Sequence, residues 1–191
     1  MTGDGMRQAP TPSMNPRAQS HEALKAMTDA ADPAGVQAVA DGWAELASGF
    51  DEAARLFERT VLRSSAGWTG DAAEAMRGQL ARIAMWSEQT GAQYRAAGSA
   101  ITEQSGAAET AKRNMPPPVP YDPAQMIRDA RASGNLFELA ALPFKLYAQK
   151  QRHDAAHEQA AEVVTNRDTS FANAAAAVPA FIPPPSLTEE A

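Results

Sequence analysis

The feature that most constrains this chain is a short break, Gly67-Trp68-Thr69-Gly70, between two long runs of helical spacing. Apolar residues before the break recur at alternating steps of three and four, which places one apolar stripe along a helix. The run after the break keeps the same steps, and its charged residues fall mostly off the stripe. Because only a few residues separate the two helices, we expect them to pack as antiparallel neighbours with their stripes facing each other.

The first stripe is formed by Val36, Val39, Trp43, Leu46, Phe50, Ala53, Phe57 and Val61, and the second by Met76, Leu80, Ile83, Thr90, Tyr94, Ala97 and Ile101. Between the stripes, a glycine lets the backbone turn where a Cβ would clash, and Trp68 supplies a large apolar group. We therefore expect a WxG turn, Trp68 to Gly70, at the tip of a helix hairpin.

Glycine also recurs inside the second run, at Gly78, Gly91, Gly98 and Gly106. Each glycine costs a helix roughly 1 kcal/mol relative to alanine. This pattern suggests that another helix approaches the backbone closely at these positions. The alternative, that small residues occur there without a packing role, is equally compatible with the sequence.

Local start and stop patterns divide the chain into helices. Asp32-Pro33 and Asp122-Pro123 each combine an N-cap acceptor with a proline in the first turn, and the prolines from Pro116 end the second long helix. The expected helices cover about 21–31, 33–64, 71–114, 123–132 and 136–177. They form one helical domain over 20–178, between a disordered arm at 1–19 and a Pro-rich disordered tail at 179–191. The predicted fold class is all-α, an elongated helical bundle built on the long hairpin.

Composition and charge exclude several functions. The formal net charge of -6 and the lack of a basic stripe argue against nucleic acid, and the sequence contains no cysteine for a disulfide or a thiolate zinc site. Neither a Gly-rich phosphate loop nor a nucleophile elbow occurs, so we expect no enzyme and no cofactor. His153 and His157 have the i, i+4 spacing of a metal pair, but solvated histidines on a helix face are the favoured interpretation, and whether they bind metal stays open.

No apolar run of about 18 residues is present for a membrane span, and the first residues lack the apolar core of a Sec signal peptide. Taken alone, these observations indicate a cytoplasmic protein. The Pro-rich tail suits a spacer better than a ligand for an aromatic groove.

Several motifs together resemble the WXG/PPE superfamily of actinobacterial type VII secretion substrates. They are Trp68-Thr69-Gly70 at the expected hairpin tip, Asp71-Ala72-Ala73-Glu74-Ala75-Met76 after it, the upstream Asp41-Gly42-Trp43-Ala44-Glu45-Leu46-Ala47, and Met115-Pro116-Pro117-Pro118. The last two fit the PPE branch, and the resemblance covers roughly residues 20–178. The Pro-Pro-Glu tripeptide is missing, which is similar to the PPE-like half of EspB-type proteins.

The resemblance implies a secreted, non-enzymatic interaction protein. It would be synthesised in the cytoplasm and exported folded by a type VII system, to the outside or the cell envelope, without a Sec signal. PPE-type proteins pair with a small PE-type helical protein, so a heterodimer is expected. The candidate partner-helix interface on the stripes consists of Trp43, Leu46, Phe50, Phe57, Leu80, Ile83, Tyr94 and Ile101.

A second surface is predicted near the turn Ser133-Gly134-Asn135, where the densest patch of large apolar residues follows. The patch either packs against the first hairpin or, as the resemblance implies, docks an EspG-type chaperone. The candidate residues are Leu136, Phe137, Leu139 and Leu142. The remaining alternatives for the whole chain are a self-associating helical scaffold and an EspB-like ring-forming secreted protein.

Overall fold

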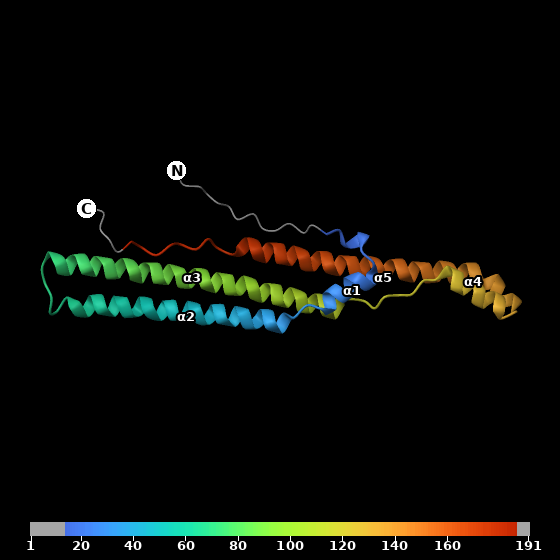
Figure 1. Cartoon of the computed structure of the whole chain (residues 1–191), viewed down its shortest axis with the longest axis horizontal. Coiled ribbons are helices and arrows are strands. Elements are labelled where there is room, and N and C mark those ends of the chain that lie inside the picture. The colour runs from blue at the N-terminus through green and yellow to red at the C-terminus, as the bar shows by residue number, and fades with distance from the viewer. Residues whose placement is uncertain (1–13, 187–191) are drawn as a thin grey trace, which may run out of the picture. The chain divides into compact units, whose positions relative to one another are not determined.

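The computed structural model describes residues 14–186, and every regular element in that range is a helix. The order is a short 3-10 helix η1 (Pro16–Ala18), then α1 (His21–Asp29), α2 (Pro33–Ser64), α3 (Asp71–Asn114), α4 (Pro123–Ala132) and α5 (Leu136–Ala177) (Figure 1). The predicted all-α fold class is confirmed. The first α-helix ends at Asp29, earlier than the expected 31.

The chain divides into two compact units, and both α3 and α5 contribute to each of them. Among the described residues, unit one holds 32–106 and 171–186, and unit two holds 14–31 and 107–170. The expected arm at 1–13 and the end of the tail at 187–191 lie outside the described residues. None of the helices in the described part is both long and apolar enough to span a membrane.

Unit one is built on α2 and α3, which lie side by side as an antiparallel hairpin (Figure 1). Contacts across the seam recur every seven residues. The Ser105 hydroxyl donates a hydrogen bond to the Pro33 carbonyl at 2.7 Å, and a Cβ added at Gly98 would lie 3.3 Å from the carbonyl oxygen of Ala40. One repeat further, a Cβ added at Gly91 would lie 3.2 Å from the carbonyl oxygen of Ala47. A seven-residue repeat in both helices is the register of a coiled coil.

Small residues fill the centre of this seam, so the two predicted stripes face each other only along one side of it, where Trp43 and Phe50 contact Tyr94. Ala40, Ala47 and Ala54 are buried at 3%, 2% and 6% exposure, whereas Leu46, in the predicted stripe, is 52% exposed. The backbones approach so closely at Gly91 and Gly98 that no large side chain fits between them. The close approach inferred from the glycines is therefore present at these two positions.

The other two glycines of α3 have open surroundings. Nothing lies within 4 Å of a Cβ added at Gly78 or Gly106. These positions match the alternative in which a small residue has no packing role.

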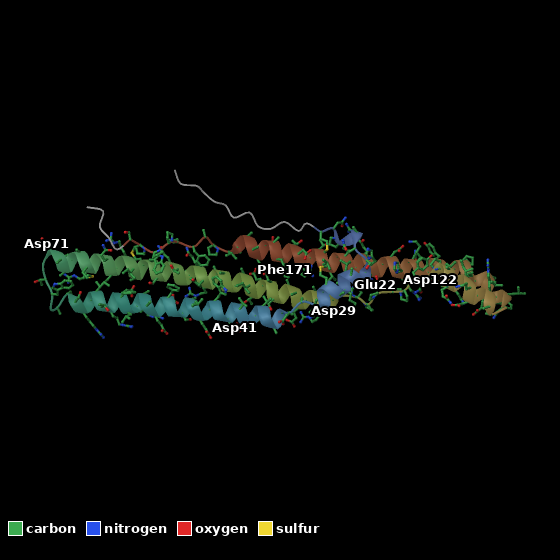
Figure 2. The ribbon with its side chains drawn as sticks, in the orientation of Figure 1. Glu22, Asp29, Asp41, Asp71, Asp122 and Phe171 are labelled. Carbon is green, nitrogen blue, oxygen red and sulfur yellow. The ribbon has the colours of Figure 1, made fainter. Side chains whose placement is uncertain are left out.

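The helix starts follow from local capping. Asp32 and Asp122 precede α2 and α4, and their carboxylates accept hydrogen bonds from Gly35 N at 3.0 Å and Gln125 N at 2.9 Å. Asp71 opens α3, where its charge matches the positive end of the helix dipole (Figure 2). The same pattern of acceptor followed by proline thus starts one helix in each unit.

Unit two has a small core between α1, the end of α3 and α5. The buried residues are Leu24, Met115, Ala160, Ala161 and Val164. Histidine side chains fix the extended segment that follows α3. His21 Nε2 lies 2.9 Å from the Pro116 carbonyl oxygen, and His153 Nδ1 lies 2.7 Å from that of Val119.

The end of the expected N-terminal arm, residues 14–19, is ordered in unit two. The Arg17 guanidinium pairs with the Glu158 carboxylate, and Asn15 caps η1. The expectation of disorder is therefore wrong for residues 14–19. The sequence pattern did not indicate this order, because the ion pair joins Arg17 to a residue far along the chain.

The beginning of the expected disordered tail also packs, in this case on the hairpin of unit one. The Ile182 carbonyl accepts a hydrogen bond from the Trp86 indole N–H at 3.0 Å, and the Ile182 N–H donates to Gln93 Oε1 at 3.3 Å. The segment is extended, as its prolines predict, but residues 179–186 are not a free spacer.

Candidate functional site

An aromatic cluster lies on one side of the hairpin, beside the seam. Trp43 and Phe50 of α2 contact Tyr94 of α3, with ring centroids 5.0 and 5.2 Å apart. Trp86 meets Phe50 edge to face at 5.6 Å, and Phe181 lies 5.9 Å from Trp43 and 5.2 Å from Tyr94. We call these five residues the aromatic cluster. Rings at such separations stabilise each other beyond the area that they bury.

The apolar surface continues around α2 past the cluster. Val39 and Leu46 are 54% and 52% exposed, and they lie seven residues apart, on nearly the same side of the helix. We call this pair the outer strip. Exposed large apolar residues in a regular row are typical of a surface that another helix covers.

The structure brings some predicted interface residues together and separates others. Trp43, Phe50 and Tyr94 meet in the aromatic cluster, and Leu46 belongs to the outer strip. The remaining predicted positions are half-buried along the two helices: Phe57, Leu80, Ile83 and Ile101. Sequence reasoning missed Trp86 as a site residue because its partners, Phe50 and Ile182, come from other parts of the chain.

The WxG turn presents its tryptophan to the surface. Trp68 is 43% exposed, and its carbonyl accepts a hydrogen bond from Arg77 Nη1 at 3.0 Å. Gly70 has φ +100°, a conformation that a residue with a Cβ rarely adopts. The expected turn is present, and the large apolar ring at its tip is partly exposed.

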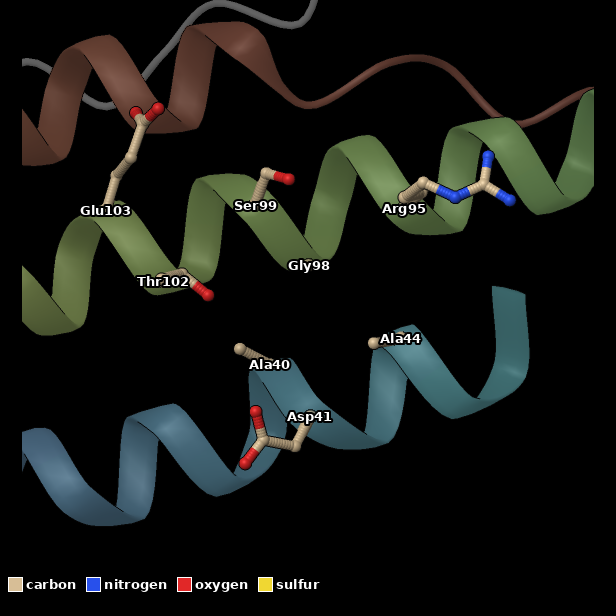
Figure 3. Close-up of a pocket in the computed structure, with 8 residues that line it drawn as sticks. All are labelled: Ala40, Asp41, Ala44, Arg95, Gly98, Ser99, Thr102 and Glu103. Atoms are coloured by element: carbon tan, nitrogen blue, oxygen red, sulfur yellow. The ribbon is translucent and has the colours of Figure 1, made fainter. Parts of the chain in front are cut away.

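The other side of the hairpin is hollowed and has charged residues at the edges of the hollow. A depression of about 380 Å³ lies between α2 and α3, over Ala40, Ala44 and Gly98 (Figure 3). Figure 3 shows the Asp41 and Glu103 carboxylates at its edges, pointing away from each other. A cation would not meet both carboxylates in this arrangement. The floor of the depression consists of small residues and contains no aromatic ring.

A second apolar surface lies at the start of α5 in unit two. Asn135 caps the helix by accepting a hydrogen bond from Phe137 N at 2.9 Å. Leu136, Phe137 and Phe144 are 80%, 87% and 80% exposed, and Tyr147 is 64% exposed. At 100° per residue these side chains share one face of α5. We call this face the tip surface.

The tip surface overlaps the predicted chaperone residues only in part. Leu136 and Phe137 lie on it. At 100° per residue, Leu139 and Leu142 fall on a different side of α5. They are also more covered, because Leu139 is 36% exposed and Leu142 is half-buried. Phe144 was not among the candidates, although its position seven residues after Phe137 indicates the same face. The exposure of these rings does not fit the alternative in which the patch is buried by packing.

A comparison with protein families agrees with these features. The PPE family model matches residues 18–181, which is most of the chain. The chain belongs to the PPE family. A search of curated proteins found no match.

PPE proteins are substrates of type VII secretion, and they are not known as enzymes. The PPE match includes the five α-helices of residues 14–186 and ends at Phe181, inside the extended segment that packs on the hairpin. The family assignment therefore covers both the aromatic cluster and the tip surface.

The histidine pair of this PPE protein has structural contacts instead of a metal-like arrangement. His153 Nδ1 lies beside the Val119 carbonyl, and His157 Nε2 lies 3.4 Å from the Arg17 carbonyl. Within residues 14–186, no group of three or more histidine, cysteine, aspartate or glutamate side chains is placed to hold a metal ion. A metal at this pair would have to displace both contacts.

Proposed function

We propose that this PPE protein is a non-enzymatic type VII secretion substrate that binds a small PE-type helical partner along the α2–α3 hairpin before export. The observation that carries the proposal is the apolar side of the hairpin, where the outer strip is half exposed beside the aromatic cluster. Two helices added to this side would complete a four-helix arrangement and remove the strip from water.

The partner would also provide an export signal, because no tyrosine of this sequence has the residues around it that the signal requires. Type VII substrates carry a Tyr-x-x-x-Asp/Glu export signal, usually on the PE or WXG partner, and here Tyr94, Tyr121 and Tyr147 are followed at that spacing by Gly98, Gln125 and Gln151. We propose that the heterodimer partner provides the signal in trans. The exposed Trp68 at the WxG turn is available to contact the partner or the secretion machinery.

The tip surface has a separate role in this proposal. An EspG-type chaperone would cover Phe137 and Phe144 in the cytoplasm, because two neighbouring phenylalanines with more than three quarters of their area exposed would otherwise promote aggregation. Pro143 lies inside α5 between them. It leaves the Leu139 carbonyl without its helical N–H donor, which adds a polar group at the edge of this surface.

Co-expression tests the partner interface. The tagged chain is produced with a PE-type protein from its own host, and the complex is measured by light scattering on a sizing column. Leu46→Glu should lower recovery of the complex at least about tenfold, because an unpaired charge would be buried under the partner helix. Ser48→Glu is the matched control, since it adds the same charge to an exposed position on another side of α2.

The two variants separate the possible outcomes. Loss of the complex for Leu46→Glu alone supports the proposed interface, whereas equal recovery for both variants would refute it. A homo-oligomer without a second chain would instead support the self-associating scaffold or the ring-forming alternative.

A further inference from the structure

The segment after α5 contacts the hairpin in a way that differs from ordinary chain packing. Both backbone polar groups of Ile182 are satisfied by side chains of α3: its carbonyl by the Trp86 indole N–H at 3.0 Å, and its N–H by Gln93 Oε1 at 3.3 Å. Side chains that form hydrogen bonds with the backbone of an extended segment are typical of peptide recognition. The hairpin therefore holds this part of the chain as it would hold a ligand.

The side chains of the segment add an anchor and a rigid frame. The Phe181 ring contacts Trp43 in a tilted arrangement and Tyr94 edge to face, with centroid distances of 5.9 and 5.2 Å. Pro183, Pro184 and Pro185 follow directly, and consecutive prolines hold an extended backbone at little entropic cost. An aromatic groove with an indole donor, occupied by a proline-flanked segment, is the arrangement found where Pro-rich peptides are bound.

The contact is open enough to be reversible. Phe181 and Ile182 remain 38% and 45% exposed, and a hollow of about 280 Å³ lies beside Pro183 and Pro185 against Met85 and Trp86. Because the segment is attached to the end of α5, its local concentration at the groove is on the order of millimolar, so even weak intrinsic affinity keeps it bound.

We propose that Trp43, Trp86, Gln93 and Tyr94 form a binding site for an extended peptide in which an aromatic and an aliphatic residue precede proline, and that residues 179–185 are its tethered ligand. The site recognises the peptide through the backbone of Ile182 and the ring of Phe181, not through the covalent connection to α5. The same peptide, supplied as a separate molecule, therefore binds the groove once the tethered copy is weakened.

The tethered ligand also controls access to the hairpin, a consequence that rests on the proposed function. Trp43 and Tyr94 cannot be covered by Phe181 and by a partner helix at the same time. A partner that docks on this side displaces the segment and frees the C-terminal part of the chain.

The test uses the full chain with ¹⁵N-labelled tryptophan, in which Trp43, Trp68 and Trp86 give three indole N–H signals; Trp86→Phe assigns the one in the groove. In the unaltered chain we expect that signal to exchange slowly with solvent. Phe181→Ala should speed its exchange at least about tenfold, because the tethered ligand loses its anchor. Phe137→Ala, an equally large change in an exposed ring of unit two, should leave the signal unchanged.

Titration then separates a binding site from a mere chain contact. A synthetic peptide of residues 178–186 should slow the solvent exchange of the Trp86 indole N–H in the Phe181→Ala chain, and this effect should saturate with peptide concentration. The same peptide with alanine in place of phenylalanine should not slow the exchange. The unaltered chain should require at least about tenfold more peptide, since the tethered copy competes. No response of the Phe181→Ala chain to millimolar peptide, or no effect of Phe181→Ala on the Trp86 signal, would overturn the proposal. Neither result depends on a PE-type partner, so the proposed function is tested separately.

Discussion

The glycines of α3 allow a direct test of the close approach between α2 and α3. In a helix interior, replacing glycine by alanine normally raises the free energy of unfolding by roughly 1 kcal/mol. Nothing lies within 4 Å of a Cβ added at Gly78. We therefore expect Gly78→Ala to stabilise the protein by about that full amount.

Gly98 should behave in the opposite way. A Cβ there would lie 3.3 Å from the Ala40 carbonyl oxygen and 3.3 Å from the Trp43 Cβ, so the helices would have to move apart slightly. Overpacking of this kind costs about 1–3 kcal/mol, which offsets or exceeds the gain in helix propensity. We expect Gly98→Ala to lie roughly 1–3 kcal/mol below Gly78→Ala in unfolding free energy.

Urea unfolding followed by tryptophan fluorescence measures this difference. Trp43, Trp68 and Trp86 all belong to unit one, so the fluorescence reports on the unit that contains the hairpin. The two midpoints should differ by about 1 M urea. Gly106→Ala, which also has open surroundings, is a second control. An equal rise in midpoint for Gly98→Ala and Gly78→Ala would refute the close approach.

Three further predictions concern single side chains. Trp68→Ala should change the unfolding free energy by less than about 1 kcal/mol in the same urea assay, because the ring is 43% exposed; a larger loss would mean that the ring is part of the core. His21→Ala should lower the free energy of unfolding by about 1–3 kcal/mol, since this histidine is 3% exposed and its loss leaves the Pro116 carbonyl without its donor. Circular dichroism during thermal melting measures the change. The hydrogen bond from Arg17 lowers the pKa of Glu158, so this exposed pair stabilises the fold at neutral pH and loses its effect as pH falls through that lowered pKa. Glu158→Gln should therefore lower the melting temperature slightly at pH 7 and not at about pH 2, and an equal effect at both pH values would contradict this reasoning.

Much of the helical framework was readable from local sequence. The pairs Asp32-Pro33 and Asp122-Pro123 start helices through contacts within a few residues, so no tertiary information is needed to place α2 and α4. The seam was harder to predict. Ala40 and Gly98 are as regularly spaced as the large apolar residues beside them, but burial of large side chains is the stronger prior, and it placed the centre of the seam on the neighbouring large residues of α2.

The candidate site depended on contacts between distant segments. Nothing in the sequence around Ile182 indicates that its backbone will pair with Trp86 and Gln93, because such a pairing requires knowing where α5 ends along α3. By contrast, Phe137 and Phe144 could have been grouped from spacing alone, since they are seven residues apart in one helix. The patch was found, but the predicted residues include Leu139 and Leu142, which are more covered than Phe144.

The seven-residue register of the hairpin limits how its length can change by insertion or deletion. Removing one residue from the first turns of α2 would rotate every later side chain by about 100°, which would turn Ala47 and Ala54 out of the seam and put Ser48 and Arg55 in their places. Removing seven residues from both arms would restore each small residue to its opposite neighbour. We therefore expect hairpins of this type to differ in length by whole repeats, matched in the two helices, with the WxG turn displaced but unchanged.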